Sequence, residues 1–209
     1  MTTTMSRNLL DTLRHRLFTR WRVVDIVVAS VIGVASGFLF AIWSVLSNPV
    51  TEPLKALLPG LQAAGYGFWL FAGVLTALII RKPGAALYGE LVAAVVSALV
   101  GNQWGWLTLV SGLTQGLGAE LVFLLFLYGN WRVYVAVLAG AGAGLAMALT
   151  DLPLWYSGAG PTFGFVYTVS AIAGGALVAG VLPWFATRGI ARTGALSRFA
   201  SGRETSVRV

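Results

Sequence analysis

The sequence predicts an all-α integral membrane protein, a bundle of six transmembrane helices with both termini in the cytoplasm. Hydrophobic residues make up 57% of its 209 residues, and charged residues only 10%. Asp151 is the single charged residue between Val133 and Thr187. A soluble protein of this size would carry more surface charge, so lipid is the expected solvent. The long apolar runs lack strand-like alternation, which favours helices over a barrel.

Six apolar runs, separated by turns rich in Gly and Pro, define the expected helices. They are expected at about 23–46, 65–80, 85–100, 107–128, 132–150 and 163–186. Asn48-Pro49 should end the first helix, because proline lacks a backbone donor. Residues 1–22 are basic, with leucines at helical spacing, and suggest an amphipathic helix on the cytoplasmic membrane surface. Residues 23–187 are then expected to form the six-helix transmembrane domain, and residues 188–209 a basic cytoplasmic tail.

The placement of charge predicts the orientation of this bundle. With six helices, both termini and the turns after the second and fourth helices share one side of the membrane. That side holds thirteen of the 14 Lys and Arg residues, and Lys55 is the exception. Cytoplasmic loops carry an excess of Lys and Arg, so this side is expected to be cytoplasmic. The net charge of +7 is therefore explained by topology, without nucleic-acid binding.

Small residues recur at every fourth position along the first helix. The row consists of Ala29, Gly33, Gly37 and Ala41. In lipid, such a row allows the backbone of another helix to approach closely. The partner could be a helix of the same chain or a helix of another protein, and the sequence leaves both possibilities open.

Two carboxyl groups within the membrane are the main candidates for a binding site. Glu90 and Glu120 lie at similar depths on adjacent antiparallel helices. No Lys or Arg lies within the membrane to pair with them, which favours a ligand or a neutral hydrogen bond between helices. Gln115 lies about 140° around the helix from Glu120, so the two share a face only if residues 116–118 bend.

The connection at 101–106 supplies further candidates, Asn102, Gln103 and Trp104. Two amides and an indole, with glycines on both sides, can fold back over a pocket. Trp43 and Tyr66 belong to a group of aromatic residues on the same side of the membrane. Aromatic faces together with carboxyls and amides suit a flat, polar heteroaromatic ligand.

Several kinds of chemistry find no support in the sequence. There is no phosphate-binding loop and no hydrolase or metalloprotease motif, so the protein is not expected to be an enzyme or to hold a cofactor. His15, the one histidine, lies in the N-terminal segment, so no histidine-based metal site is expected within the bundle.

Residues 84–126 resemble the YkoE family of substrate-binding (S) components of energy-coupling-factor (ECF) transporters. The resemblance is carried by Gly84-Ala85-Ala86 through Glu90-Leu91, by Gly101-Asn102-Gln103-Trp104-Gly105, and by the run from Gln115 to Phe123. It implies a six-helix protein in the cell membrane that binds thiamine or its hydroxymethylpyrimidine precursor. It also implies a transmembrane coupling subunit that contacts the first helix, and two ATPase subunits.

The predicted function is therefore substrate binding for an ATP-driven vitamin importer, with the ligand entering from outside. The expected ligand-binding residues are Glu90, Asn102, Gln103, Trp104, Gln115, Glu120, Trp43 and Tyr66. The expected partner contacts are Ala29, Gly33, Gly37 and Ala41. The alternatives are an accessory subunit without a ligand, an S component for another small heteroaromatic compound, and a membrane enzyme acting on a lipid. The missing catalytic motifs count against the last.

Overall fold

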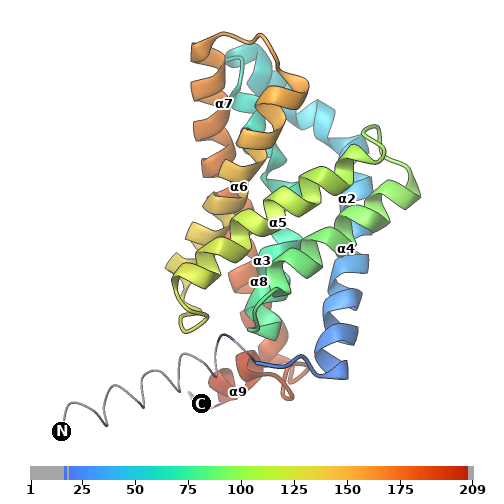
Figure 1. Ribbon diagram of the computed structural model, residues 1–209, viewed down its shortest axis with the longest axis vertical. Coiled ribbons are helices and arrows are strands. Elements are labelled where there is room, and N and C mark those ends of the chain that lie inside the picture. Colours follow the sequence, from blue (N-terminus) through green and yellow to red (C-terminus); the bar gives the residue numbers. More distant parts are fainter. Residues whose placement is uncertain (1–16, 18, 207–209) are drawn as a thin grey trace, which may run out of the picture.

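The computed structural model describes residue 17 and residues 19–206, with side chains described up to residue 203. Within that part the chain is helical throughout (Figure 1). The elements are α2 (Val23–Leu57), the 3₁₀-helix η1 (Leu61–Leu70), α3 (Phe71–Ile80), α4 (Ala85–Val100), α5 (Leu107–Leu125), α6 (Val133–Trp155), α7 (Pro161–Gly174), the π-helix η2 (Gly175–Val181), α8 (Leu182–Arg192) and α9 (Ala200–Ser206). The amphipathic helix expected in 1–22 falls mostly outside the described residues.

Five helical segments are long and apolar enough to cross a membrane. They are Val23–Leu57, Leu61–Ile80, Leu107–Leu125, Val133–Trp155 and Pro161–Arg192. Ala85–Val100 is also apolar but has 16 residues. At about 1.5 Å per residue it extends roughly 24 Å, less than the ~30 Å of a hydrocarbon core. These lengths and compositions indicate a multi-pass membrane protein.

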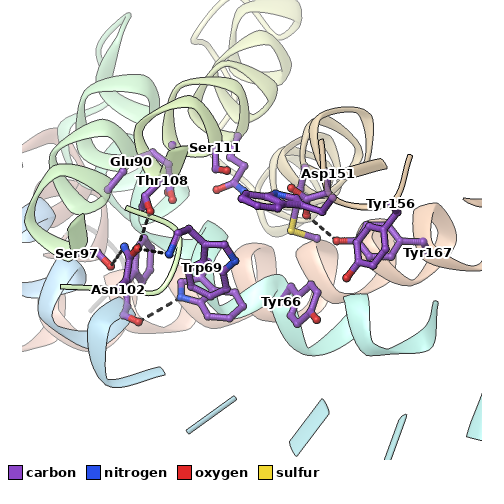
Figure 2. A pocket seen from close by; sticks show the side chains of 17 residues that line it. Tyr66, Trp69, Glu90, Ser97, Asn102, Thr108, Ser111, Asp151, Tyr156 and Tyr167 are labelled. Carbon is purple, nitrogen blue, oxygen red and sulfur yellow. Dashed lines mark hydrogen bonds between the residues drawn. The ribbon is translucent and has the colours of Figure 1, made fainter. Parts of the chain in front are cut away.

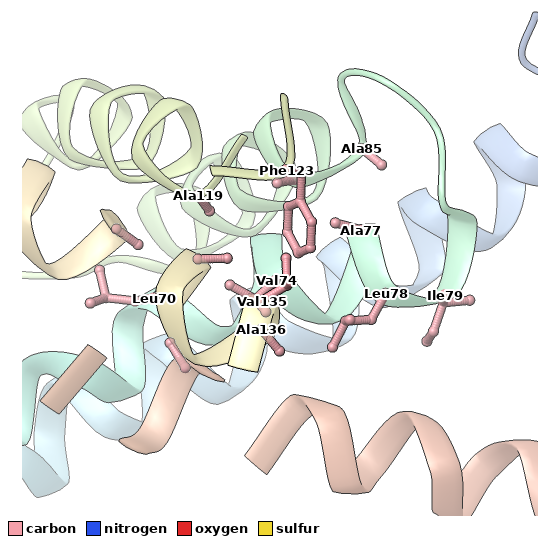
Figure 3. Packing of buried hydrophobic residues seen from close by; sticks show 14 of the residues in the cluster. Leu70, Val74, Ala77, Leu78, Ile79, Ala85, Ala119, Phe123, Val135 and Ala136 are labelled. Carbon is pink, nitrogen blue, oxygen red and sulfur yellow. The ribbon is translucent and has the colours of Figure 1, made fainter. Parts of the chain in front are cut away.

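Helix α3 lies at the centre of the bundle. Eight of its ten residues are buried, and it contacts α2, α4, α5, α6, η2 and α8. Figure 3 shows Val74 and Ala77 of α3 near Phe123 of α5 and Val135 of α6. Around this centre α2 packs on α4, α4 on α5, α5 on α6, and α6 on η2. Contacts with these surrounding helices hold α3, a helix of ten residues without a charged side chain, in place.

The expected end of the first helix at Pro49 is wrong. Helix α2 continues through Pro49 and Pro53 to Leu57, and it changes direction towards that end in Figure 1. Proline removes one backbone hydrogen bond and bends a helix, but neighbouring helices and hydroxyl groups compensate in a membrane protein. Within the same stretch, the Thr51 hydroxyl donates to the carbonyl of Ser47, one turn earlier, at 2.9 Å.

The second predicted helix, 65–80, is two elements. The 3₁₀-helix η1 precedes α3 because its backbone must pass very close to α7. A Cβ atom on Gly67 would lie 2.4 Å from the carbonyl oxygen of Gly174. Glycine at both positions permits this approach.

The sixth predicted helix, 163–186, is interrupted by the π-helix η2 and extends to Arg192 through α8. Pro183 has no N–H to donate to the carbonyl of Ala179, and the wider π turn lies directly before it. The other boundaries differ less. The prediction of 85–100 is confirmed, the helix expected to end at 128 ends at Leu125, and the one expected to end at 150 continues to Trp155.

Most of the small-residue row of α2 packs inside the chain, where the sequence had left open a partner within or outside it. The row is Ala29, Gly33, Gly37 and Ala41. A Cβ atom on Gly33 would lie 2.7 Å from the Cβ atom of Val92, and one on Gly37 would lie 2.5 Å from the Cβ atom of Val96. Both valines belong to α4, and Ala29 is fully buried. Close packing of α2 on α4 therefore accounts for the two glycines of the row, and the contact of Ala41 with a partner protein stays a prediction.

A charged cluster joins the start of α2 to the turn before α4. The buried carboxylate of Asp25 accepts hydrogen bonds from the backbone N–H of Arg22 at 2.7 Å and from the Lys82 ammonium at 2.6 Å. The Arg22 guanidinium lies 2.9 Å from the same carboxylate. The indole N–H of Trp21 donates to the carbonyl of Pro83 at 3.0 Å. The two segments are thus fastened together by several polar contacts at one end of the bundle.

Candidate functional site

A cavity of about 330 Å³ lies between η1, the α4–α5 hairpin, α6 and α7. Its size falls within the range of small-molecule sites. Its polar and charged lining residues are Glu90, Ser97, Asn102, Thr108, Ser111, Gln115 and Asp151; its other lining residues are Phe40, Tyr66, Trp69, Ala94, Trp104, Gly112, Met147, Trp155, Tyr156 and Tyr167. Figure 2 shows Glu90 and Asp151 on opposite sides of Trp69 in this view.

Aromatic rings form one wall of the cavity. The ring centroids of Trp69 and Trp104 are 5.0 Å apart, edge to face, and those of Tyr66 and Trp69 are 5.4 Å apart. The Trp69 indole N–H donates to the carbonyl of Phe40 in α2 at 3.2 Å. Since this bond fixes the Trp69 ring, the wall offers preformed faces for stacking.

Asn102 organises the connection that closes the cavity at the α4–α5 end. Its side-chain oxygen accepts hydrogen bonds from the backbone N–H groups of Trp104 and Gly105, at 2.9 and 3.0 Å. The same oxygen accepts from the Thr108 hydroxyl at 3.0 Å, and the side-chain amide donates to Ser97 at 3.1 Å. Asn102 therefore positions Trp104, and its hydrogen-bonding capacity is largely used within the chain.

Glu90 is the carboxyl group best placed to meet a ligand. The residue is 1% exposed. One carboxyl oxygen accepts the backbone N–H of Gly73, in the first turn of α3, at 2.6 Å. The other oxygen, Oε1, is buried and has no hydrogen-bond partner among the described residues. Because an unpaired buried acceptor is costly and Glu90 lines the cavity, this oxygen is available to a donor on a bound molecule.

Asp151 supplies a second carboxyl group that the sequence did not identify as a ligand contact. It accepts a hydrogen bond from the Tyr167 hydroxyl at 2.6 Å, as Figure 2 shows. The Tyr167 ring lies 5.1 Å from that of Tyr156 and 6.4 Å from that of Tyr66. The sequence contained a signal, since Asp151 is the only charge in a long apolar stretch. The sequence predicts a helix that ends at residue 150 and leaves Asp151 in the following loop, whereas α6 extends far enough to carry it into the bundle.

The structure brings five of the eight expected ligand-binding residues to the cavity: Glu90, Asn102, Trp104, Gln115 and Tyr66. Gln103 is exposed and lies outside the lining. Trp43 is also outside it; its ring stacks at 4.8 Å on Phe68, and its indole nitrogen is buried without a hydrogen-bond partner among the described residues.

Glu120 lies away from the cavity, and its carboxylate is fully engaged. It accepts hydrogen bonds from the backbone N–H groups of Gly84, Ala86 and Leu87, at 2.6, 2.8 and 3.2 Å. The Tyr128 hydroxyl donates to it at 2.7 Å. Burial and the neighbouring Glu120 carboxylate raise the pKa of Tyr128, so this tyrosine remains a donor. Glu120 thus caps the start of α4, where unpaired N–H groups favour an anion.

Within the described residues, no group of three or more His, Cys, Asp or Glu side chains could hold a metal ion. The two carboxyl groups of the cavity bond to a backbone N–H and to a tyrosine. This donor set suits hydrogen bonding to an organic molecule better than coordination of a transition metal.

Comparisons with known proteins agree with this architecture. A family model described as "ABC-type cobalt transport system, permease component" matches residues 24–146. A protein of Bacillus subtilis (strain 168) named "Putative HMP/thiamine permease protein YkoE" is 35% identical over 185 residues, which cover 88% of this chain and 92% of that protein.

A crystal structure of an S-component of an ECF transporter superposes with a TM-score of 0.82. Its sequence identity is 34%, and the match covers 90% of this chain and 95% of that chain. These relatives are components of transporters and not enzymes. The chain matches the permease family over more than half of its length, and it belongs to the YkoE-type S components of ECF transporters.

Proposed function

We propose that this chain captures thiamine or its hydroxymethylpyrimidine precursor for an ATP-driven importer. The printed name of the Bacillus subtilis relative supports this class of ligand. The observation that carries the proposal is the unpartnered Oε1 of Glu90 beside an aromatic wall. An aminopyrimidine is flat and carries an amine donor next to a ring nitrogen, so it complements a carboxyl oxygen and a stacking face together.

In this proposal the pyrimidine ring stacks on Trp104, and Trp69, whose ring is nearly perpendicular to that of Trp104, borders the ligand at its edge. Glu90 accepts a hydrogen bond from the exocyclic amine, and the Gln115 amide bonds to a ring nitrogen. The opposite side of the cavity, at Asp151, receives the rest of the ligand. If that part is the cationic thiazolium ring of thiamine, the Asp151 carboxylate and the tyrosine rings around it provide electrostatic and cation–π attraction.

Trp104 and Trp106 form a matched pair for testing the stacking wall. Trp104 lines the cavity, whereas Trp106 is 71% exposed and does not. Trp104→Ala is expected to weaken thiamine or hydroxymethylpyrimidine binding about tenfold, roughly 1.4 kcal/mol, through loss of stacking. Trp106→Ala should bind like the wild type. Isothermal titration calorimetry on the purified variants measures both, and equal affinities in the two variants would place the ligand elsewhere.

The same proposal includes a transmembrane coupling subunit and two ATPase subunits as partners, as the resemblance to ECF transporters implies. ATP hydrolysis in those subunits would drive release of the ligand into the cell. Uptake of labelled thiamine by cells that contain all components should be lost in the Trp104→Ala variant at limiting ligand concentration. An accessory subunit without its own ligand would support uptake equally well with either tryptophan replaced.

The proposed topology has six membrane crossings in the plasma membrane, with both termini in the cytoplasm. Its support is the charge distribution, together with Figure 1, where the 81–84 turn and α9 lie at one end of the bundle and the α6–α7 connection at the other. The chain has no cysteine, so single cysteines report on accessibility. Cysteine at Lys55 should react with an impermeant thiol reagent added to intact cells, and cysteine at Arg198 should not. The reverse pattern would invert the orientation.

A further inference from the structure

Helix α8 and its connection to α9 carry three exposed arginine side chains at the end of the bundle that carries the 81–84 turn. Arg188 and Arg192 are exposed and lie four residues apart on α8, so they share one face. Arg198 is exposed in the connection to α9. We refer to Arg188, Arg192 and Arg198 as the basic surface.

The basic surface is held in a folded segment. Leu196 and Phe199, on either side of Arg198, are 5% and 4% exposed and belong to the hydrophobic core. The Ser201 hydroxyl donates to the carbonyl of Ile79, at the end of α3, at 3.0 Å. The Arg22 guanidinium lies 5.9 Å from the centre of the Phe199 ring. The arginines are therefore displayed at defined positions beneath the bundle.

The sequence of α8 changes from apolar to basic along the helix, as is typical where a membrane helix reaches the lipid headgroups. Leu182 and Phe185 are 57% and 60% exposed and suit contact with lipid chains. Trp184 lies between them in the sequence, and tryptophan is typical of the membrane interface. The Arg188 guanidinium lies 3.9 Å from the centre of the Trp184 ring, one turn further along the helix. A stacked guanidinium still has its N–H donors free at the edge, where they can meet an anion.

Acidic side chains at this end of the described structure are already engaged. Asp25 is buried and paired with Arg22 and Lys82. Glu120 is occupied by backbone N–H groups and Tyr128. Among the side chains that the structure describes, up to residue 203, neither of these two carboxylates pairs with Arg188, Arg192 or Arg198.

We propose that the basic surface binds the headgroups of anionic phospholipids. Guanidinium groups recognise phosphate by paired hydrogen bonds, and a polybasic segment next to a membrane helix is attracted to anionic lipid. A bound lipid would hold α8 and α9 against the base of α3. This inference concerns the end of the molecule away from the cavity and does not depend on the identity of the transported ligand.

The test counts lipids bound to purified protein by native mass spectrometry, with phosphatidylglycerol and phosphatidylcholine supplied in equal amounts. The wild type is expected to prefer phosphatidylglycerol at least fivefold. The triple variant Arg188→Gln, Arg192→Gln, Arg198→Gln should lose that preference, and the triple Arg→Lys variant should keep part of it. Lys55→Gln, at the other end of the molecule, is the control and should leave the preference unchanged. A wild type without preference, or a glutamine variant that keeps it, would overturn the proposal.

Thermal unfolding of the wild type in nanodiscs provides a test that needs no variant. Phosphatidylglycerol should raise the midpoint relative to phosphatidylcholine, and 1 M salt should remove most of the gain, because the screening length falls to about 3 Å. An equal gain from free inorganic phosphate would assign the surface to a soluble anion instead. If the glutamine variant binds lipid like the wild type but no longer assembles with the coupling subunit, the basic surface binds an acidic protein surface instead. Either result would overturn the proposal.

Discussion

Replacing Glu90 by glutamine is expected to weaken the binding of thiamine or hydroxymethylpyrimidine about thirtyfold, roughly 2 kcal/mol. The glutamine side-chain oxygen can still accept the N–H of Gly73, which is 2.6 Å from the carboxylate. The unpartnered position of Oε1, which the proposal assigns to the ligand, then becomes an NH₂ donor in place of an acceptor. A ligand amine would meet a donor, so an attractive contact would become an unsatisfied pair. Isothermal titration calorimetry on purified protein measures the change.

Two comparisons make this result specific. Glu52→Gln removes an exposed carboxylate whose side chain is 63% accessible, and it should bind the ligand like the wild type. The thermal stability of Glu90→Gln should stay close to that of the wild type, because the bond to α3 is retained. If Glu90→Gln binds the ligand with wild-type affinity, Oε1 does not contact it. If the variant unfolds, the carboxylate is required for folding, and the role of Glu90 is to hold helices together through a hydrogen bond.

Asp25→Ala is expected to lower the free energy of unfolding by about 3 kcal/mol, as found when one partner is removed from a buried ion pair. Asp25 is fully buried, and its loss leaves the Lys82 ammonium, 12% exposed, with the carbonyl of Arg20 at 2.7 Å. The Arg22 backbone N–H and guanidinium lose their acceptor as well. Thermal or chemical unfolding in detergent micelles reports the loss.

The chain contains a matched exposed pair for comparison with Asp25. Glu52 and Lys55 are three residues apart, as are Arg22 and Asp25, and their nearest charged atoms are 3.4 Å apart. Both side chains are more than half exposed, so Glu52→Ala should change stability by less than about 0.5 kcal/mol. Equal effects of Asp25→Ala and Glu52→Ala would mean that the charged cluster does not hold α2 to the turn before α4.

The sequence predicted the positions of the helices better than it predicted how they bend and which helices they pack against. Helix 85–100 appeared as expected because apolar runs bounded by glycine leave few alternatives. The effect of Pro49 was misjudged because the helices that stabilise α2 are distant in sequence. Similarly, the row at Gly33 and Gly37 has the same spacing whether its partner is α4 or another protein. Only the three-dimensional packing distinguishes these cases.

For the candidate site too, the sequence identified candidate residues but did not determine which of them line the cavity. Glu90 and Glu120 look alike in the sequence, as carboxyls in apolar helices of one hairpin. One lines the cavity, and the other caps the start of α4. The difference depends on the angle at which α5 crosses α4, which residue spacing does not determine. Asp151 reaches the cavity because α6 continues through Pro153 to Trp155, and sequence rules favour an earlier end at such a proline.

An experimental structure of the protein saturated with thiamine or hydroxymethylpyrimidine would show whether this cavity binds a heteroaromatic vitamin or vitamin precursor. The predicted result is a pyrimidine ring stacked on Trp104, with its amine within about 3 Å of Oε1 of Glu90. An empty cavity at saturating ligand, or a ligand bound outside the space between η1, the α4–α5 hairpin, α6 and α7, would contradict this proposal.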